Sequence, residues 1–468
     1  MPVCLYNSLT KKKEEFIPLK ANTVNIYACG VTVYDQCHIG HARSLYVFDV
    51  IRRYLKYRGY DVRFVRNITD IDDKIIDKAR ELKKTSDEVA RENIAAYYED
   101  LKRLHIDVAD VEPKATDNIP DMIVHIGELI ARGFAYEAGG DVYFSVRKFS
   151  AYGKLSGQSI EEMREAVRIE KDSKKKDPLD FALWKSSKEG EPSWDSPWGR
   201  GRPGWHIECS VMSVKHLRCQ TLDIHAGGRD LIFPHHENEI AQTEVLTKKP
   251  LAKYWLHHGL LTINSQKMAK SSGNFITVEE ALKKYGADDL KLFFLSSHYG
   301  SPVDFTKEKM QEAHKALQRF DILFWKAYEL MKAKENVLPL QVDFITKGKS
   351  DFIEAMDDDF NTAKALGCLF DLVNDTNKFI DHGPKDGNYA GVICRAVDTI
   401  AELAKNIFGL FTAEVAGELT EELKQFLEER RQARAGKNFK RSDELRDLLK
   451  KKGVAVEDTK EGQTWRWL

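Results

Sequence analysis

The stretch that decides the fold runs from Thr23 to Val65 and reads TVNIYACGVTVYDQCHIGHARSLYVFDVIRRYLKYRGYDVRFV. Two short apolar runs, Thr23 to Tyr27 and Val62 to Val65, enclose a helical pattern from Ser44 to Tyr57. A strand, a helix and a second strand in this order predict two parallel strands joined by a crossover helix. We therefore expect an α/β, Rossmann-like domain that binds a nucleotide.

The composition is that of a multidomain protein without a membrane span. The chain has 468 residues, more than one hydrophobic core usually organises, so about two to four domains are expected. Hydrophobic residues make up 42% and charged residues 31%, and no apolar run approaches the roughly 20 residues that cross a bilayer. The N-terminus has no basic segment followed by an apolar one, so the cytoplasm is the expected location.

Cysteine usage and net charge narrow the chemistry. The cysteines are odd in number and scattered, at positions 4, 29, 37, 209, 219, 368 and 394. This set does not resemble a secreted disulfide framework, and reduced thiols or metal ligands are expected. A formal net charge of -1 gives no general attraction to nucleic acid. Any site for a polyanion must therefore come from local clusters of Lys and Arg.

The rest of the chain predicts further domains. A helix from Ile119 to Arg132, a strand from Asp141 to Ser145 and a charged stretch from Lys171 to Pro178 predict an inserted subdomain with a charged loop, or a linker. Long helical patterns then cover 307–334, 352–376 and 390–411, followed by helices to Ala435 and over 442–452. The expected domains are a catalytic first half over 1–125, a connective insertion over 126–200, a catalytic second half over 201–306, an all-α bundle over 307–412 and a small C-terminal domain over 413–468.

The motif His38-Ile39-Gly40-His41 follows the first predicted strand and opens the helix after it. Helix N-termini present unpaired N–H groups and a positive dipole end, which suit phosphate, and imidazoles add further donors. Gly40 would let an adenosine approach the backbone closely. Two alternatives are a surface turn with two histidines and a zinc pair at positions i and i+3.

A second motif, Lys267-Met268-Ala269-Lys270-Ser271-Ser272-Gly273-Asn274, lies far downstream on a predicted loop. Two lysines three residues apart can hold the β- and γ-phosphates while charge moves onto a pyrophosphate leaving group. The alternative is a solvated basic loop. No GxGxxG motif follows a strand and no Walker motif occurs, so the usual dinucleotide and P-loop cradles are missing.

Together the two motifs resemble the paired HIGH and KMSKS signatures of class I aminoacyl-tRNA synthetases, with Ala269 in place of the first serine. A third group indicates which amino acid is used. Two cysteines, Cys29 and Cys209, together with His235 and Glu239 at helical spacing i and i+4, offer donors that suit Zn²⁺. Each of them could instead be an ordinary packed or solvated residue.

At this group the resemblance to cysteinyl-tRNA synthetases becomes specific. The blocks that carry it are Ala28 to Asp35, Val65 to Lys74, Gly204 to Ser210 and Phe233 to Glu239, and the similarity runs over nearly the whole chain. The resemblance implies an ATP-dependent cysteine–tRNA ligase with one zinc per subunit, whose ligands are Cys29, Cys209, His235 and Glu239. Soft sulfur prefers zinc far more than a hydroxyl does, so serine would be rejected on binding.

The resemblance also implies roles for single residues. His38 and His41 would stabilise the phosphates of ATP, which enters with Mg²⁺, and Lys267 and Lys270 the leaving pyrophosphate. The remaining implied contacts are to ATP by Gly40, Gly228, Asp230 and Lys270, and to the substrate cysteine by Thr69 and Trp205. Trp205 is also an ordinary core residue type in such a block.

A basic C-terminal segment suggests the tRNA partner. Cationic side chains cluster between Arg430 and Lys452, and Trp465 could stack on an unpaired base, although a solvated helix face is the common reading of such a run. The family's C-terminal domain reads the anticodon, which implies contacts to tRNA(Cys) by Arg430, Arg431, Lys437, Lys440, Arg441 and Trp465. Val31 and Gly300 depart from the family's more usual Pro and Arg, and Gly300 puts one tRNA contact in doubt.

Two rival functions share most of these features. A paralogous ligase would transfer cysteine to an amino sugar, but such paralogues lack the anticodon-binding tail. A catalytically silent zinc- and RNA-binding protein is the second rival, and the intact HIGH and KMSKS lysines and histidines argue against it. We expect a monomer that uses L-cysteine, ATP and tRNA(Cys), with no membrane partner.

Overall fold

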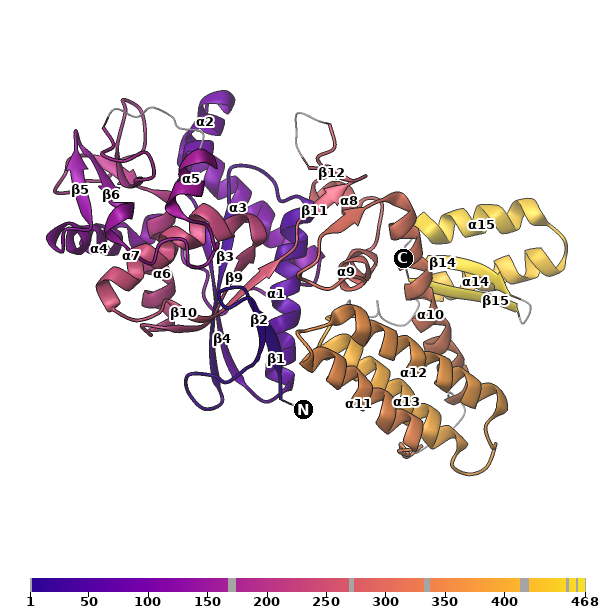
Figure 1. The fold of residues 1–468 in the computed structure, drawn as a ribbon. Coiled ribbons are helices and arrows are strands. Elements are labelled where there is room, and N and C mark those ends of the chain that lie inside the picture. The colour runs from indigo at the N-terminus through magenta and orange to yellow at the C-terminus, as the bar shows by residue number, and fades with distance from the viewer. Residues whose placement is uncertain are drawn as a thin grey trace. The chain divides into compact units, whose positions relative to one another are not determined.

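The structure is a computed structural model that describes residues 2–166, 174–268, 273–331, 337–412, 421–451, 454–459 and 462–467 (Figure 1). The chain divides into two compact units, Met1–Leu410 and Phe411–Leu468. Among the described helices, none is both long enough and apolar enough to cross a membrane.

A four-stranded parallel sheet forms the centre of the first unit. The strand order is β10-β9-β3-β4, with bounds β3 Thr23–Thr32, β4 Asp61–Thr69, β9 Leu222–Gly228 and β10 Ala252–His258. Helix α1 (Ile39–Tyr57) joins β3 to β4, and α1 and α6 (Trp205–Leu217) lie on opposite sides of the sheet (Figure 1). The Rossmann-like α/β fold expected from the sequence is confirmed.

The two strands predicted from the sequence behave as central parallel strands. Every residue from Phe64 to Thr69 is buried, because helices cover both faces of the sheet. The register between β3 and β4 shifts between Ala28 and Val31, and there the Gly30 N–H donates to Asn67 Oδ1 at 2.8 Å. A Cβ atom at Gly30 would lie 1.6 Å from the Asn67 carbonyl oxygen, so this approach of the two strands requires glycine.

Between β4 and β9 the chain adds helices and a second sheet. The antiparallel strand order is β5-β6-β7-β8, with bounds β5 Ala135–Ala138, β6 Asp141–Phe144, β7 Phe181–Ser186 and β8 Gly201–Pro203. The helices here are α2 Asp73–Leu82, α3 Ser86–Arg103, α4 Ile119–Ala131 and α5 Ile160–Ala166. The predicted helix from Ile119 and strand from Asp141 are both present. Residues 167–173, where the predicted charged loop begins, lie outside the described residues.

Shorter elements complete the first unit. A hairpin, β1 Cys4–Asn7 and β2 Lys12–Glu15, opens the chain. After β10, a small sheet has the order β12-β11-β13, with bounds β11 Leu261–Ile263, β12 Gln266–Lys267 and β13 Val303–Phe305. The remaining helices are α7 Glu237–Thr247, α8 Val278–Leu282, α9 Ala287–Leu295, α10 Lys307–Met331, α11 Asp343–Asp357, α12 Thr362–His382 and α13 Tyr389–Asn406.

One predicted helix is wrong in its extent. The pattern over 352–376 predicted one helix, but the structure has α11 and α12 with a turn between them. Asp359 and Phe360 adopt left-handed φ angles of 61° and 50° in this turn. The buried Asp359 carboxylate accepts hydrogen bonds from the Tyr6 N–H at 2.8 Å and the Tyr299 hydroxyl at 2.9 Å. Helical periodicity does not reveal these partners, because they are remote in the chain. Their hydrogen bonds stabilise the turn between α11 and α12.

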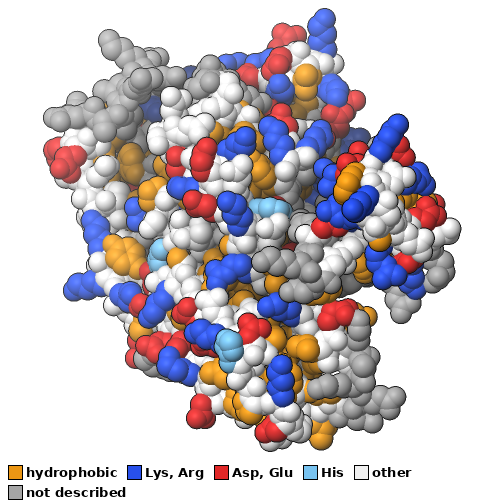
Figure 2. Space-filling model, turned by 90° about the vertical axis from the view of Figure 1, so that its right-hand side faces the viewer, with side chains coloured by type: hydrophobic (Ala, Val, Ile, Leu, Met, Phe, Trp, Pro, Cys, Tyr) orange, Lys and Arg blue, Asp and Glu red, His pale blue; other side chains and the backbone are white. Residues whose placement is uncertain are grey.

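Charges of both signs are interspersed on the surface. On the face drawn in Figure 2, basic and acidic side chains alternate over most of the described area. The mixture agrees with the formal net charge of -1. Attraction of a polyanion to this face would therefore depend on local clusters rather than on a long-range field.

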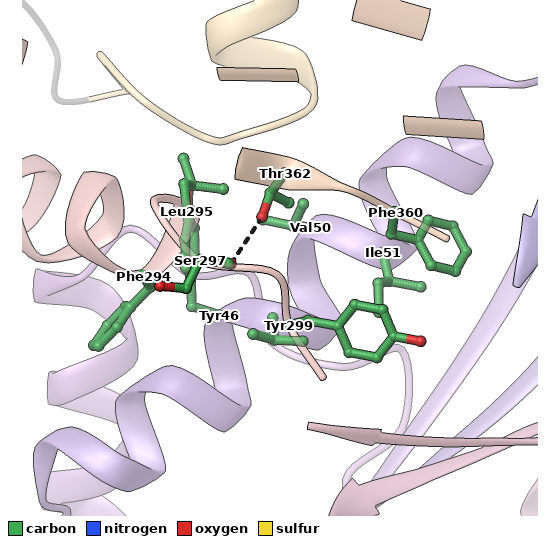
Figure 3. Close-up of a pocket in the computed structure, with 10 residues that line it drawn as sticks. Tyr46, Val50, Ile51, Phe294, Leu295, Ser297, Tyr299, Phe360 and Thr362 are labelled. Atoms are coloured by element: carbon green, nitrogen blue, oxygen red, sulfur yellow. Dashed lines mark hydrogen bonds between the residues drawn. The ribbon is translucent and has the colours of Figure 1, made fainter. Parts of the chain in front are cut away.

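A small apolar cavity marks where α1 meets α9 and the turn before α12 (Figure 3). Its volume is about 10 Å³, and aromatic rings of Tyr46, Phe294, Tyr299 and Phe360 contribute much of its lining. One water molecule needs about 10–15 Å³ and polar partners, so this gap is a packing defect rather than a ligand site.

The second unit is a helical pair packed on a hairpin. Helices α14 (Glu421–Ala435) and α15 (Phe439–Lys451) precede strands β14 (Val454–Thr459) and β15 (Gly462–Trp467), which pair antiparallel. The core consists of Leu423, Leu427, Leu449, Val454 and Val456. This hairpin was not predicted from the sequence. Apolar and polar residues alternate only weakly along its two strands, so the usual signal of a strand is faint.

Arg430 corrects one expectation from the sequence. Its side chain is fully buried and its guanidinium donates to both carboxylate oxygens of Asp458, at 3.0 and 2.8 Å, and to Gln463 at 2.6 Å. A guanidinium engaged in this way is not presented to a tRNA phosphate. The residue instead fastens α14 to the hairpin.

We expect Arg430→Ala to destabilise the second unit by about 3 kcal/mol, because it leaves Asp458 and Gln463 without their shared donor. Hydrogen exchange of residues 421–467 in the full chain measures the loss. The control is Arg431→Ala, since exposed Arg431 pairs with Glu428 at the surface and its loss should cost less than about 1 kcal/mol. Equal exchange in the two variants would contradict the structural role of Arg430.

Candidate active site and metal centre

Two neighbouring strands of the parallel sheet separate at its carboxyl edge. From β3 the chain turns through α1 to β4, whereas β9 pairs on the other side of β3. Pairing of β3 with β9 ends at Ala28 and Ala226, although both strands continue beyond these residues. Ligands of open α/β sheets bind where the strand order reverses in this way. Cys29 is the first residue of β3 past the last paired one.

His38 and His41 cap the N-terminus of α1 reciprocally. The His41 N–H donates to His38 Nδ1 at 3.2 Å, and the His38 N–H donates to His41 Nδ1 at 3.4 Å. The two rings stack with centroids 3.7 Å apart. Burial lowers the pKa of His38 to about 4 and also lowers the pKa of His41, so both imidazoles are neutral near pH 7.

The capping contacts determine which ring nitrogen carries the proton. A backbone N–H is always a donor, so each Nδ1 must accept and each neutral ring must hold its proton on Nε2. Both histidines can therefore donate one hydrogen bond from Nε2. This arrangement fits the expectation that the two imidazoles act as donors beside a helix N-terminus.

The second motif lies directly against this helix start. The Ile39 N–H donates to the Ile276 carbonyl at 3.1 Å, and the Val278 N–H donates to the Cys37 carbonyl at 2.8 Å. A Cβ atom at Gly40 would lie 3.2 Å from Met268 Cε. Lys267 is exposed at the end of β12, and Lys270 lies outside the described residues. The structure thus brings together two motifs that are more than 200 residues apart in the chain.

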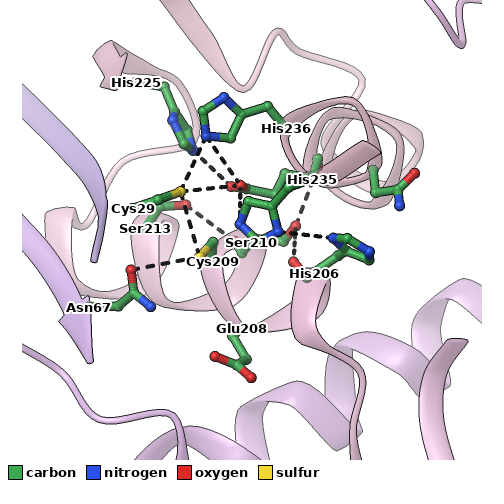
Figure 4. A network of polar contacts seen from close by, with 12 residues as sticks. Cys29, Asn67, His206, Glu208, Cys209, Ser210, Ser213, His225, His235 and His236 are labelled. Carbon is green, nitrogen blue, oxygen red and sulfur yellow. Dashed lines mark hydrogen bonds and ion pairs between the residues drawn. The ribbon is translucent and has the colours of Figure 1, made fainter. Parts of the chain in front are cut away.

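The four predicted metal ligands also meet. Donor atoms of Cys29, Cys209, His235 and Glu239 all lie within 4.8 Å of one another. Figure 4 shows Cys29, Cys209 and His235 pointing toward one another. The two Sγ atoms are 3.9 Å apart, and Glu239 Oε1 is 3.5 Å from Cys29 Sγ and 3.1 Å from His235 Nε2. Cys29 comes from β3, Cys209 from α6, and the other two from the start of α7 and the turn before it.

The charges of this group fit a bound cation. Burial and the neighbouring acids Cys209 and Glu239 raise the pKa of Cys29, whereas Cys29 and His235 lower that of Cys209 against the effect of burial. Two thiols and a carboxylate of one buried cluster thus compete to be ionised, and a divalent cation would relieve this competition. Two sulfurs, one imidazole and one carboxylate are a typical donor set for zinc.

Further histidines around the group were not predicted. His225 Nε2 lies 2.7 Å from Glu239 Oε2, His206 Nδ1 lies 2.9 Å from His235 Nδ1, and His236 Nε2 lies 3.3 Å from Cys29 Sγ. Such contacts orient metal ligands and select their tautomers. His225, His236, Cys29 and Glu239 also form a second possible ligand group. The only signal in the sequence was the density of histidines after position 205.

The two glycines that end β9, Gly227 and Gly228, lie close to neighbouring side chains. A Cβ atom at Gly228 would lie 2.4 Å from Asp230 Oδ1, and one at Gly227 would lie 2.8 Å from His236 Cε1. A larger residue at Gly227 would displace the buried His236 ring, whereas one at Gly228 would displace the exposed Asp230 side chain. Asp230 is exposed at the carboxyl end of β9, where its oxygens can accept hydroxyl hydrogen bonds.

The two residues expected in the amino-acid pocket differ in exposure. The Trp205 ring lies over His235, with centroids 4.2 Å apart, and the side chain is 38% exposed. Thr69 is buried at the end of β4 and donates to Glu208 Oε2 at 2.8 Å. Burial, with Cys209 and nearby aspartates, raises the pKa of Glu208.

The remaining residues expected to contact tRNA lie on the surface of the second unit. Arg431, Lys437, Lys440, Arg441 and Trp465 are exposed. Arg441 pairs with Glu429 and Glu444, each at 3.3 Å. Partners at the surface reduce the local positive charge, so the cluster is weaker than its composition suggests.

The two roles of His38 can be separated by substitution. We expect His38→Ala to lower the free energy of unfolding by about 1 kcal/mol through the lost cap. His38→Asn retains an N-cap side chain, and its stability should stay within about 0.5 kcal/mol of the native chain. Both should slow ATP-dependent activation about 100-fold, because both lose the Nε2 donor. Urea unfolding and single-turnover kinetics test this, and a fully active Asn variant would contradict the donor role.

Comparison with known proteins gives three family matches. Residues 15–315 match the class I (C) catalytic domain of tRNA synthetases, residues 351–412 match the DALR domain, and residues 416–466 match the cysteinyl-tRNA ligase anticodon-binding domain. Cysteine–tRNA ligases from Persephonella marina and Geobacter metallireducens are 49% and 48% identical to this chain, with 100% of each chain covered. That of Geobacillus thermodenitrificans is 46% identical, over 99% of this chain and 98% of the relative.

Solved structures agree on the fold. Methionyl-tRNA synthetase of Mycobacterium tuberculosis, in complex with methionyl-adenylate, matches with a TM-score of 0.65 at 15% identity, over 83% of this chain and 92% of that one. A leucyl-tRNA synthetase of Agrobacterium radiobacter matches with a TM-score of 0.61 at 10% identity, over 84% and 85%. With the catalytic match over residues 15–315 and relatives of nearly equal length, the chain belongs to the cysteine–tRNA ligase family of class I aminoacyl-tRNA synthetases.

Proposed function

We propose that this chain activates L-cysteine with ATP and transfers the cysteinyl group to the 3′-terminal adenosine of tRNA(Cys). The observation that carries the proposal is the gathering of Cys29, Cys209, His235 and Glu239 at the carboxyl edge of the sheet. The same edge holds the capped helix start and the loop after β9, which suit ATP. A thiol-selective group beside a nucleotide site is what an enzyme that activates cysteine needs.

The first step joins cysteine to AMP. The cysteine carboxylate attacks the α-phosphorus of ATP, the bond to the β-phosphate oxygen breaks, and pyrophosphate leaves. His38 and His41 donate from Nε2 to phosphate oxygens, and Lys267 and Lys270 stabilise the charge that develops on the pyrophosphate. Gly40, Gly228 and Asp230 hold the adenosine, and Mg²⁺ accompanies ATP. The enzyme orients reactants and stabilises charge, without a covalent enzyme intermediate.

Selection of cysteine depends on the metal ligands. When bound, zinc supplies a soft acceptor for the substrate thiolate, which a serine hydroxyl does not match. Cys29, Cys209, His235 and Glu239 would hold it, while His206 and His225 keep His235 and Glu239 in position. Trp205, whose ring lies over His235, would contact the substrate cysteine together with Thr69. No separate editing site is then needed for serine.

The proposed domains follow the sequence boundaries. Residues 1–125 and 201–306 form the catalytic domain, 126–200 the insertion, 307–412 the helical bundle and 413–468 the anticodon-binding domain. The family matches at 351–412 and 416–466 support the last two assignments. The exposed cations and Trp465 of the second unit would contact tRNA. Arg430 would support them indirectly, because it holds α14 to the hairpin. We further propose a monomer in the cytoplasm.

The rival functions are less well supported. A ligase that transfers cysteine to an amino sugar would have no use for residues 416–466, which match an anticodon-binding domain. A silent RNA-binding protein would not need the reciprocal capping that places two histidine donors at the start of α1. Amino-acid-dependent pyrophosphate exchange, with and without tRNA, separates all three functions.

The zinc assignment is tested by Cys209→Ser. We expect lost zinc and weakened cysteine activation, because a hydroxyl is a poor ligand for zinc at this position. Elemental analysis and cysteine-dependent pyrophosphate exchange measure the two effects. Cys219→Ser is the matched control, since Cys219 lies outside the ligand group and should keep both properties. Full zinc content with normal activation in Cys209→Ser would overturn the assignment.

The anticodon-binding role is tested by a chain that ends before Leu419. Pyrophosphate exchange should survive, because the ATP and metal residues all precede this point, whereas aminoacylation of tRNA should fall sharply. Loss of several phosphate contacts should also flatten the dependence of tRNA affinity on salt. If the shortened chain charged tRNA at the full rate and with an unchanged salt slope, the second unit would have another role.

A further inference from the structure

Arg43, on the helix that begins at the HIGH motif, is buried without an acidic partner. The residue is 1% exposed, and no carboxylate among the described residues forms an ion pair with it. Burial lowers the pKa of Arg43 to about 10, so its guanidinium stays charged near pH 7. Burial of a charged group is unfavourable unless polar partners replace the water. The groups that replace the water around this guanidinium therefore deserve identification.

These groups are four backbone carbonyl oxygens. Arg43 Nη1 donates to the Gly259 and Leu260 carbonyls, at 2.7 and 3.0 Å. Arg43 Nη2 donates to the Tyr299 and Ser301 carbonyls, at 3.3 and 2.5 Å. The first pair lies between β10 and β11, and the second pair lies in the loop before β13. Each end of the planar guanidinium thus binds one of the two connections that lead into the small sheet β12-β11-β13.

Backbone contacts keep these two connections close to each other. The Gly259 N–H donates to the Tyr299 carbonyl at 2.9 Å, and the Val303 N–H donates to the Leu260 carbonyl at 3.0 Å. A Cβ atom at Gly259 would lie 2.2 Å from the Ser301 carbonyl oxygen, so this approach requires glycine. The guanidinium therefore binds at a point where two segments of backbone are in direct contact.

The junction lies a short distance along the chain from both phosphate motifs. Arg43 follows His41 by two residues on α1. Thr262 of β11 follows Leu260 by two residues and pairs with Lys267 of β12. Strand β11 also lies beside α1 (Figure 1). The four hydrogen bonds thus connect the helix that carries the histidines with the sheet that carries Lys267.

We infer that Arg43 is a positioning residue for cysteine activation: it fixes the small sheet to α1 and so determines where Lys267 lies relative to the two histidines of the HIGH motif. The inference rests on the proposed function and adds a residue that acts through Lys267. Carbonyl oxygens only accept, and all four belong to the backbone, so they hold the guanidinium in one orientation. A lysine donates from a single nitrogen, so we expect it to bind one connection and to release the other.

Arg43→Lys tests this through the substrates of pyrophosphate exchange, measured on the zinc-loaded full chain. We expect KM for pyrophosphate to rise about 10-fold, because a displaced β11–β12 hairpin moves Lys267 away from the pyrophosphate. KM for cysteine should change less than about 2-fold, since the proposed zinc ligands lie outside the small sheet. A general loss of structure would change both KM values alike.

Arg52→Lys is the matched control. Arg52 is another buried arginine of α1, but it donates to the Val108 carbonyl at 2.8 Å and to Asp49 at 2.9 Å, and neither belongs to the small sheet. Both KM values of this variant should stay within about 2-fold of the native values. A rise in KM for pyrophosphate that is equal in the Arg43 and Arg52 variants would overturn the inference, because Arg43 would then only support the fold.

Gly259→Ala perturbs the same junction from the other side, because the added Cβ displaces the Ser301 carbonyl that Arg43 binds. It should also raise KM for pyrophosphate selectively, and it replaces Arg43→Lys in the test if that variant does not fold. An unchanged KM for pyrophosphate, or an equal rise for pyrophosphate and cysteine, overturns the inference. If the native chain exchanges no pyrophosphate with cysteine, the proposed function is overturned instead.

Discussion

Parallel pairing of β3 with both β4 and β9 is the constraint on which the rest of the structure depends. Parallel strands must end at the same edge of their sheet, so the segments that follow them meet there whatever their separation in the chain. The pairing of Tyr27 with His225 and with Val65 sets this register. It places Cys29, Thr69 and the loop after Gly228 at one edge of the sheet, where the proposed activation of cysteine takes place.

The buried polar groups at this edge are stable only as a set. Each isolated thiol, carboxyl group or imidazole would lose its hydration on burial, which is unfavourable unless partners replace the water. His225 and His235 satisfy Glu239, His206 contacts His235, and Asn67 connects Gly30 with Thr69. The strands that pair in the sheet therefore also carry side chains that satisfy one another at the site.

Elements of the fold that depend on residues close in sequence could be predicted, whereas features that depend on remote partners could not. The strand, helix and strand from Thr23 to Val65 follow from periodicity, since one element is a local property of its own residues. The break between α11 and α12 does not, because Asp359 is held by Tyr6 and Tyr299, which are remote in the chain. Arg430 is a second example. It stands in a basic run that suggested an exposed tRNA contact, but it is buried, because Asp458 on the hairpin provides its partner.

By itself the sequence determined the type of chemistry: two motifs for nucleotide phosphates, a set of zinc-type donors and a strand–helix–strand start. These depend on residue identity and short spacing, which the chain carries wherever it folds. Only the tertiary structure decided that Cys29 and Cys209 lie 3.9 Å apart, that the histidines at the start of α1 can donate from Nε2, and that Thr69 is buried against Glu208. Such properties depend on pairs of groups that packing brings together. In the histidine contacts, the backbone N–H can only donate, so it sets the direction of the hydrogen bond.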